Sequence, residues 1–466
     1  MKKFLPYILL PICVVILSRN NPFFWDTTYH SILGQWFYEN GTHGFILPLE
    51  LDAGHPPFFG YYLSCIWKLF GKTLTVSHLA ILPFALGIYW QMFRLIHRYI
   101  PKEYAELTAL FIAFEPTLLA QCSLVSYELV YVFFYLLGLN AIIRKQKIII
   151  SLSLIGLILI NSRGLFAIGA LFITQLIIDY KENKTSGNPK IVKFANFIPF
   201  IFPIALGIGW YSYHYMQSSW WFLSPSEAYH GQRKILGLGG ILRNVVIIIW
   251  RCLDFGRIGL WILLLISIYR TYIKKIYLDN NFQRLLIYCS VPLIVFSLAF
   301  IPFSNPIGHR YYLVFYLLFV PFVIYSFTSA YQGKLKYILI SAVGVLLLSG
   351  HFWLYPPGIA MGWDSTLAHI PYFELRKAMI NHIKKENIPF NTIGTVFPNK
   401  NTLKETDLVA DTNRFSNLNL KKNQYVLQSS IMNDFSDAEL NELNEKWILV
   451  QEYKKSGIYM RLYHKR

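Results

Sequence analysis

The chain has 466 residues, of which 55% are hydrophobic and only 15% charged, and its formal net charge is +18. Apolar runs long enough to cross about 30 Å of hydrocarbon recur along it, which excludes a soluble globular enzyme, a disordered chain and a disulfide scaffold. Most basic residues lie in short loops between these runs, which indicates membrane topology rather than nucleic-acid binding. The sequence therefore predicts a polytopic α-helical membrane protein.

The apolar runs predict about 11 transmembrane spans. The first, 4–18, follows two lysines as a signal peptide would, but no small-residue cleavage site comes after it, so we expect it to remain as an uncleaved span. A polar outer loop, 19–76, follows. The remaining expected spans are 77–96, 104–121, 129–143, 147–161, 164–180, 194–216, 256–270, 283–303, 310–330 and 335–355.

Segment 57–70 within the outer loop decides the orientation. As a helix it covers only about 21 Å, which is too short to cross comfortably. If it does not cross, the basic clusters at 94–102, 144–147, 181–193, 270–275 and 334–336 all fall on the side of Lys2 and Lys3. The positive-inside rule then predicts a cytoplasmic N-terminus, with 57–70 as an interfacial helix at the outer face and 241–252 as a second one.

The tail, 361–466, is polar and charged, unlike the transmembrane part, 1–360. A helical stretch at 372–386 precedes strand-like runs at 392–397, 424–428, 447–452 and 458–463. This pattern predicts a small α+β domain on the extracytoplasmic side. The tail contains no recognisable catalytic motif.

Asp26 is the first candidate for chemistry, since ionisable groups at a membrane surface are costly to place there without a use. It precedes 31–39, which has apolar residues at helical spacing and is expected to lie on the membrane as an amphipathic helix. Asp26 is therefore either the N-cap of that helix or a general base shielded by neighbouring aromatic residues.

Asp52 and His55 lie in the stretch that leads into segment 57–70. Two prolines, Pro56 and Pro57, fix the start of the short helix, and Gly54 permits a tight turn before them. This arrangement places Asp52 and His55 just above the membrane. They are either solvated turn residues or contacts for a polar group of a substrate.

Arg163 lies in a tight outer turn between two apolar spans, and Arg310 begins a late span in the stretch His309-Arg310-Tyr311. A lone arginine at such a place either extends its guanidinium to the interface or binds phosphate oxygens in a bidentate way.

Two acids and one aromatic loop complete the candidates. Glu128 stands at the outer end of a span, whereas Glu115, before Pro116, lies inside one, either as a buried structural acid or facing a cavity. The loop from Trp220 to Lys234, which includes His230 and Arg233, is rich in aromatic residues that either anchor the protein at the interface or cover an opening to the site. No Asp-x-Asp pair or zinc-spaced set occurs, so no tightly bound metal is predicted, and a loosely held divalent cation is left open.

The order and sidedness of these motifs resemble the GT-C membrane glycosyltransferases, in particular protein O-mannosyltransferases and bacterial lipid A aminoarabinose transferases. The matching features are Asp26 soon after the first span, Pro56-Pro57 before a short aromatic helix, Glu128 in the next outer loop, Arg163 before a glycine, and Arg310-Tyr311 at a late span. The chain departs from the family in having Thr27 where a second acid is common, and Glu128 where Asp is common.

The resemblance implies an inverting transfer of a sugar from a polyprenyl-phosphate carrier to an acceptor hydroxyl, in the inner membrane of a bacterium and without a cofactor. Asp26 would act as the base, and Arg163 and Arg310 would hold the leaving lipid phosphate. Asp52, His55 and Glu128 would bind the sugar or the acceptor, with His309 and Tyr311 also at the site. The acceptor would be a lipid, a glycan such as lipopolysaccharide, or a protein of the cell envelope.

The main alternative is a transporter or lipid flippase. Such a protein is expected to have charged residues near the middle of the membrane, and often two related halves. Only Glu115 lies deep in an expected span, and no related halves are evident. The sequence therefore favours the glycosyltransferase interpretation.

Overall fold

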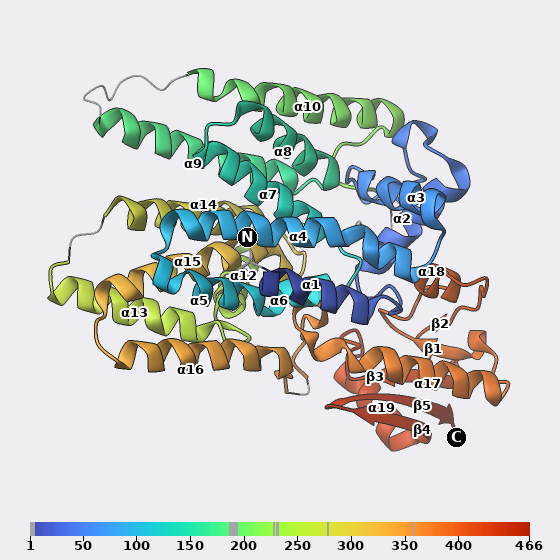
Figure 1. The fold of residues 1–466 in the computed structure, drawn as a ribbon. Helices are drawn as coiled ribbons and strands as arrows, with labels where there is room; N and C mark the ends of the chain where they lie inside the picture. The colour runs from blue at the N-terminus through green and yellow to red at the C-terminus, as the bar shows by residue number, and fades with distance from the viewer. Residues whose placement is uncertain (1–4, 186–193, 227–228, 230–232, 277–278, 357) are drawn as a thin grey trace.

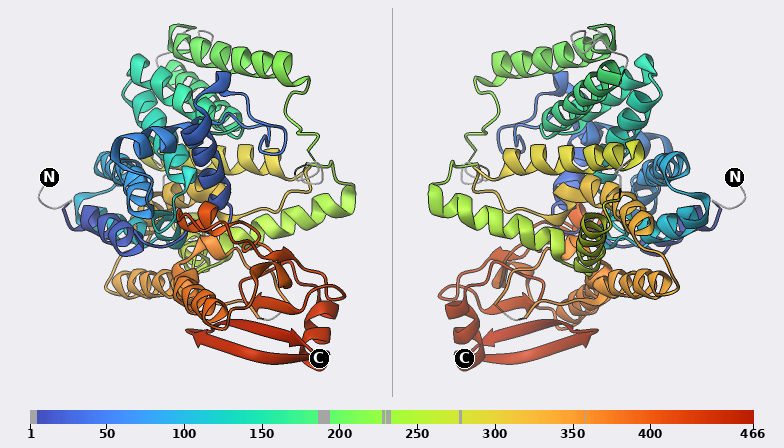
Figure 2. Two further views of the ribbon diagram at one scale, coloured as in Figure 1. Left: turned by 90° about the vertical axis from the view of Figure 1, so that its right-hand side faces the viewer. Right: turned by 90° about the vertical axis from the view of Figure 1, so that its left-hand side faces the viewer.

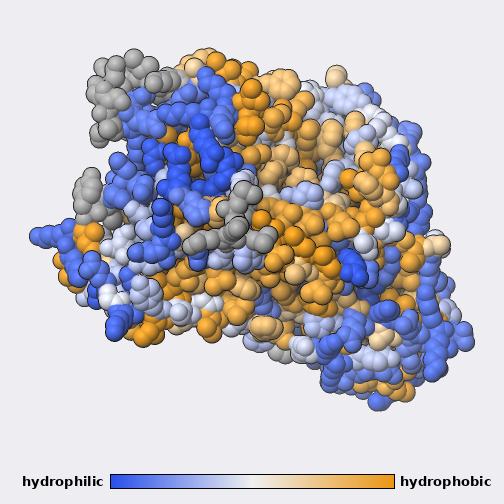
Figure 3. All heavy atoms as spheres, viewed as in Figure 1, coloured by the Kyte–Doolittle hydropathy of each residue, from blue (hydrophilic) through white to orange (hydrophobic). Residues whose placement is uncertain are grey.

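The computed structural model describes residues 5–185, 194–226, 229, 233–276, 279–356 and 358–466. His230 and the basic residues of 186–193, which entered the sequence analysis, lie outside them. Long helices run side by side through the body of the molecule (Figure 1). Hydrophobic side chains cover the middle of this body, and hydrophilic ones gather toward its left end and over the C-terminal region at the lower right (Figure 3).

Five described helices are long and apolar enough to cross a membrane, namely α4 (Leu74–Tyr99), α9 (Gly164–Thr185), α14 (Asn280–Phe300), α15 (Leu313–Ala330, with η4, His309–Tyr312, before it) and α16 (Leu335–Ser349, with η5, Gly350–Phe352, after it). The bent pair α12 (Leu238–Leu253) and α13 (Ile258–Ile273), which meet at 88°, would make six. The shorter apolar helices are α1 (Leu5–Ser18), α7 (Tyr127–Ile143) and α8 (Lys147–Ile160). The chain is an integral membrane protein, but the expected count of about 11 spans is not confirmed.

The predicted span 104–121 is wrong as one helix. It is divided into α5 (Lys102–Ala113) and α6 (Pro116–Cys122). Glu115 adopts extended backbone dihedral angles between them, and its side chain accepts a hydrogen bond from the backbone N–H of Leu118 as the N-cap of α6. The break occurs here because Pro116 has no N–H to donate and disfavours helical geometry in the residue before it.

The outer loop folds into α2 (Thr27–Asn40), η2 (His43–Phe45) and α3 (Phe58–Phe70). Helix α3 corresponds to the predicted interfacial segment 57–70, and α2 corresponds to the predicted amphipathic stretch. The two pack together through buried side chains such as Phe37 on α2 and Trp67 on α3. The 3-10 turn η3 (Phe194–Asn196) and helix α10 (Ile198–Ser218) correspond to the expected span 194–216.

The predicted interfacial helix 241–252 is α12, and the predicted span 256–270 is α13. The break between them carries Asp254 and Arg257. Leu242, Val246 and Ile249, at helical spacing on α12, are exposed. Such an apolar stripe on a helix that turns sharply away from the next one is typical of a helix lying in the membrane interface.

The C-terminal region begins with η6 (Trp363–Ser365), η7 (Leu367–His369) and α17 (Pro371–Lys385). It continues with η8 (Phe390–Thr392) and a five-stranded sheet of order β2-β1-β3-β5-β4, in which β1 (Ile393–Thr395) pairs in parallel with β2 (Ser416–Asn417) and β3 (Tyr425–Ser429), and β5 (Ile458–Lys465) pairs antiparallel with β3 and β4 (Trp447–Lys455). The sheet lies beneath the helical body in both views of Figure 2. The predicted helix and four strands are present, whereas the short β2, α18 (Leu403–Asp407) and α19 (Asp437–Lys446) were not predicted.

The C-terminal region packs directly on the outer loop, so both lie at the same end of the molecule (Figure 1). The backbone N–H of Phe23 donates to the carbonyl of Thr406 at 2.8 Å. The hydroxyl of Ser31, on α2, donates to the carbonyl of Glu405 at 2.6 Å. These contacts hold the start of α2, where Asp26 lies, against the C-terminal region.

Candidate active site

Asp26 immediately precedes α2, at the position of its N-cap, but its side chain makes no capping hydrogen bond. The carboxylate instead forms an ion pair with Nη2 of Arg310 through its Oδ2 atom. The Asp26 side chain is 54% exposed. The contact partner of Asp26 is therefore a buried arginine of the site rather than the end of its own helix.

Arg310 is the centre of the cluster, because each of its guanidinium nitrogens faces a different carboxylate. Nη2 contacts Asp26, Nη1 contacts Asp364, and Nε lies 3.4 Å from Oε1 of Glu128. The Arg310 side chain is only 10% exposed. Its place in η4, directly before the buried helix α15, fixes its backbone at the outer end of the bundle.

Glu128 joins the two predicted arginines. It lies in the first turn of α7, where the hydroxyl of Ser126 caps its backbone N–H at 3.1 Å. Its Oε1 atom accepts a hydrogen bond from Nη2 of Arg163 at 2.5 Å. The Glu128 side chain is 2% exposed, and its Oε2 atom is buried without a hydrogen-bond partner among the described residues. A buried carboxylate oxygen of this kind is suited to accept a hydrogen bond from a ligand.

Arg163 is held by the turn that carries it. Oδ1 of Asn161 accepts from the backbone N–H of Arg163 at 2.9 Å. Gly164 is required because a Cβ atom there would lie 1.9 Å from the carbonyl oxygen of Leu157. The guanidinium donates to the hydroxyl of Tyr127 at 2.6 Å and lies 4.4 Å from the ring centre of Tyr311. These contacts direct it into the cluster instead of toward the interface.

His55 connects this cluster to the aromatic outer loop. Its Nδ1 lies 2.7 Å from the hydroxyl of Ser162, the neighbour of Arg163, and Nη2 of Arg233 lies 3.0 Å from its Nε2. Burial, reinforced by the positive charge of Arg233, lowers the pKa of His55 well below its usual value. A neutral His55 can therefore accept from Arg233 through Nε2 and donate to Ser162 through Nδ1.

Arg233 differs from the other two arginines in its partners. It donates to the carbonyl of Phe222 at 2.5 Å and to that of Ala53 at 3.0 Å. Among the described residues no carboxylate lies within ion-pair distance of it, and burial lowers the pKa of its guanidinium. A half-buried cation whose partners among the described residues are carbonyls and a neutral ring attracts an anion.

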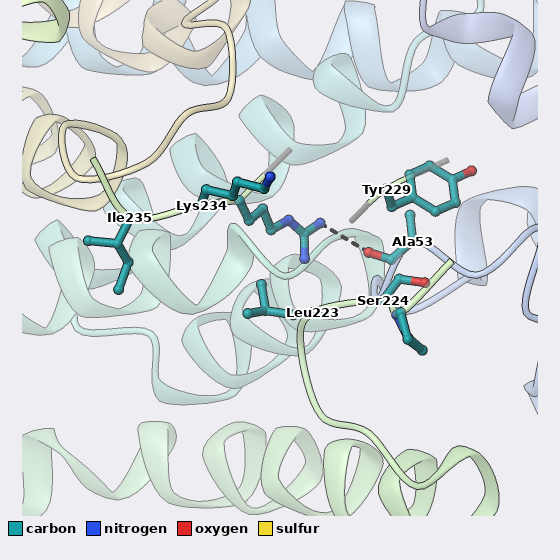
Figure 4. A pocket seen from close by; sticks show the side chains of 8 residues that line it. Ala53, Leu223, Ser224, Tyr229, Lys234 and Ile235 are labelled. Carbon is teal, nitrogen blue, oxygen red and sulfur yellow. Dashed lines mark hydrogen bonds between the residues drawn. The ribbon is translucent and has the colours of Figure 1, made fainter. Parts of the chain in front are cut away.

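A cavity of about 530 Å³ opens beside Arg233. In Figure 4, Lys234 and Ile235 lie on one side of it, and Ala53, Ser224 and Tyr229 lie opposite. Gly54 closes the turn at its edge: its φ is +77°, and its backbone N–H donates to Oδ1 of Asp52 at 2.9 Å. The cavity thus combines basic side chains with mainly apolar walls.

The structure does not bring Asp52 and His309 into the Arg310 cluster. Asp52 is buried, and its Oδ2 atom lies 2.8 Å from Nε2 of His214 on α10. His309 is fully buried and turns toward the α12–α13 break, where its Nε2 lies 2.9 Å from Oδ2 of Asp254. Both predicted residues therefore connect structural elements around the site.

The deep acid Glu115 also has a partner that the sequence analysis missed. Arg257, in the α12–α13 break, forms an ion pair with its Oε1 atom and donates to the hydroxyl of Thr117 at 2.6 Å. Both charged side chains are almost fully buried. Thr117 in turn donates to the carbonyl of Ser365 at 3.1 Å, next to Asp364. Of the two interpretations offered for Glu115, the structure supports the buried structural acid.

We expect Glu115→Gln to lower the free energy of unfolding by about 3–5 kcal/mol, because it removes the charge of the carboxylate that pairs directly with the buried Arg257. Denaturation by SDS in mixed micelles measures this change. The control is Asp411→Asn, which removes an ion pair with Lys384 that is much more exposed and is expected to cost about 0–1 kcal/mol. Equal losses in the two variants would contradict a structural role for the buried pair.

Among the described residues no group of three or more His, Cys, Asp or Glu side chains is arranged to hold a metal ion. Three carboxylates do surround Arg310, but the guanidinium occupies the space between them. That the site works without a tightly bound metal stays a prediction.

No family model matches the chain, and no curated protein sequence matches it. Among solved structures it is similar to ArnT from Cupriavidus metallidurans bound to undecaprenyl phosphate, with a TM-score of 0.51 and 10% sequence identity, over 98% of this chain and 97% of that one. The apo state of the same protein gives a TM-score of 0.49 and 11% sequence identity, again over 98% of this chain and 97% of that one. The likeness to the bound form covers both the membrane helices and the C-terminal region, and it confirms the predicted GT-C-like fold.

Proposed function

We propose that this chain transfers a sugar from a polyprenyl-phosphate carrier to an acceptor hydroxyl at the extracytoplasmic face of a bacterial inner membrane, with inversion at the anomeric carbon. The observation that carries the proposal is the cluster at one end of the bundle. In it an exposed carboxylate, Asp26, is held by Arg310, and contacts through Glu128, Arg163, its neighbour Ser162 and His55 lead to Arg233, a cation with no carboxylate partner among the described residues.

Asp26 serves as the general base of this reaction. Its ion pair uses Oδ2, which leaves Oδ1 for the acceptor hydroxyl. As Asp26 takes the proton, the acceptor oxygen attacks the anomeric carbon from the side opposite the phosphate. The bond between that carbon and the phosphate oxygen then breaks, and polyprenyl phosphate leaves with one more negative charge. Positioned bases of this kind typically contribute about 10²–10⁴-fold to a rate.

Fixed cations stabilise the leaving phosphate. Arg163 and Arg233 flank His55, and Arg310 adjoins Arg163 through Glu128. Arg233 is the best placed of the three to take up a new anion, because carboxylates already neutralise the other two. Charge that develops on the phosphate during bond breaking is stabilised most by donors that are already in position.

The other predicted residues bind the sugar or support the site. The Glu128 oxygen that has no hydrogen-bond partner among the described residues accepts a hydrogen bond from a sugar or acceptor hydroxyl, and Tyr311 forms part of the wall beside Arg163. His55 holds Arg233 at the edge of the sugar site. Asp52 acts one step further away, because its contact with His214 fixes the turn before His55.

The cavity beside Arg233 suits a lipid-linked donor. Its basic side chains match a phosphate, and its apolar walls match the first isoprene units of a polyprenyl chain. The structurally similar ArnT was crystallised with undecaprenyl phosphate, which supports a carrier of this class for the present chain.

The test uses purified protein in lipid vesicles, a panel of undecaprenyl-phosphate-linked pentoses and hexoses, and envelope extract as acceptor. We expect release of undecaprenyl phosphate from at least one donor, and a product whose anomeric configuration is opposite to that of the donor. Retention of configuration would contradict the inverting mechanism. Consumption of no donor in the panel would contradict the proposed function.

The proposed orientation has its own test, in a variant whose five native cysteines are replaced by alanine. Single cysteines are introduced at Leu49 and Val409, both exposed at the outer end, and at Lys145 at the other end. We expect an impermeant maleimide to label positions 49 and 409 in intact cells, and position 145 only after lysis. The reverse labelling pattern would contradict the proposed orientation of the chain in the membrane.

A further inference from the structure

The segment that follows the last apolar helix supplies a third carboxylate to the site. Asp364 lies in η6 and contacts Nη1 of Arg310. Helix α6 holds this segment in place, because the side-chain amide of Gln121 donates to the carbonyl of Asp364 at 2.8 Å. The hydroxyl of Thr117 holds the next residue, Ser365, in the same way.

The three carboxylates around Arg310 differ in their solvent exposure. Asp26 is 54% exposed, whereas Asp364 is 5% and Glu128 is 2% exposed. A guanidinium is a rigid planar fork, so two fixed partners determine the direction of its remaining nitrogen. Asp364 and Glu128 therefore hold Arg310 from the protein side, and Nη2 is left to hold Asp26 toward solvent.

We propose that Asp364 is a positioning residue of the reaction: together with Glu128 it orients Arg310, and through Arg310 it sets the place of Asp26. This inference rests on the proposed function. It makes the segment after α16 an essential part of the active site, and no step of the transfer requires Asp364 to touch the substrate.

A merely structural role is the competing explanation, in which Asp364 only ties the C-terminal region to the bundle. The two explanations differ in what a variant loses. A positioning role predicts slower transfer by folded protein with donor binding nearly unchanged, because Asp364 contacts Arg310 and not Arg233, the cation best placed to take up the phosphate. A structural role predicts lower stability with normal turnover by the protein that remains folded.

The experiment compares Asp364→Asn, Asp364→Glu and the control Asp411→Asn, which alters an ion pair with Lys384 elsewhere in the C-terminal region. Binding is measured with undecaprenyl phosphate, and turnover with the donor from the panel that wild type consumes. We expect Asp364→Asn to reduce kcat by about 10²-fold, the scale of a misplacement near 1 Å, with the Kd for undecaprenyl phosphate within about twofold of wild type. Asp364→Glu, which can still reach Arg310, should recover about tenfold of the loss, and Asp411→Asn should match wild type.

Wild-type kcat in folded Asp364→Asn would overturn the inference, as would a weaker Kd that accounts for the whole loss of activity. If Asp364→Asn does not fold, Asp364→Glu decides: the inference requires a lowered kcat at unchanged Kd, and a wild-type kcat overturns it. Failure of the proposed function is distinguishable, because wild-type protein would then consume no donor at all.

Discussion

Asp26→Asn should reduce sugar transfer by about 10³-fold or more while leaving the fold and the binding of undecaprenyl phosphate intact. The amide has the size of the carboxylate and can still contact Arg310, but it cannot take a proton from an acceptor hydroxyl. Loss of a general base alone costs about 10²–10⁴-fold. Turnover of the lipid-linked donor by purified variant and wild type measures the effect.

The matched control for this prediction is Asp52→Asn, an acid of the same outer loop that contacts His214 instead of Arg310. We expect a smaller loss from it, accompanied by lower stability, because Asp52 is buried. Transfer at near the wild-type rate by Asp26→Asn would remove Asp26 from the mechanism. A loss of transfer that follows unfolding of the variant, as measured by gel filtration, would contradict the prediction that the fold stays intact.

Arg233→Gln should weaken the binding of undecaprenyl phosphate by about 10–100-fold. A hydrogen bond that involves a charged group is worth about 1.5–3 kcal/mol. Among the described residues no carboxylate pairs with Arg233, so its guanidinium can bind the phosphate. Titration of the protein in nanodiscs with undecaprenyl phosphate gives the two dissociation constants.

The control is Arg243→Gln, which removes an exposed arginine of α12 in the same part of the chain. Its dissociation constant should equal that of wild type. Equal weakening in both variants would indicate a general effect of charge at the membrane surface.

Arg163 requires a paired variant, Arg163→Gln with Glu128→Gln, because its removal alone leaves Arg310 as the one cation beside the buried Glu128 among the described residues. We expect that double variant also to bind undecaprenyl phosphate less tightly.

The sequence predicts the side of the membrane on which each candidate residue lies, and this part of the site could be predicted. Basic loops indicated which ends of the helices share a face, so Asp26, Glu128, Arg163 and Arg310 were expected at one end of the bundle, and contacts now link them. Their sidedness does not fix which acid pairs with which arginine. That depends on the packing of helices that are distant in the sequence.

Two features, the helix break at Pro116 and the carboxylate of Asp364, could also have been predicted from the sequence. Pro116 after an acid is a typical helix start, and it marks the break that divides the expected span 104–121. Asp364 follows the last expected span at its outer end, on the same face as the other acids. Sidedness alone would therefore have made it a candidate.

Other features could not be read from the sequence. Arg257 belongs to a break between two apolar segments, and only the three-dimensional packing places it on Glu115. His309 is adjacent to Arg310 in the sequence, but successive residues of the η4 turn point in different directions, so it faces Asp254 instead of the cluster. The distinct position of Arg233 likewise depends on which carboxylates lie near it in space.

The most direct test of the central claim compares the envelope glycolipids and glycans of cells that carry the wild-type gene, no gene, or Asp26→Asn. If the Asp26–Arg310 cluster transfers a sugar from a lipid carrier, mass spectrometry will show a species in wild-type cells that is heavier by one sugar residue. That species will be absent from both other strains, and the lipid-linked donor will accumulate in them. Identical envelopes in all three strains, with no donor accumulating, would contradict the proposal.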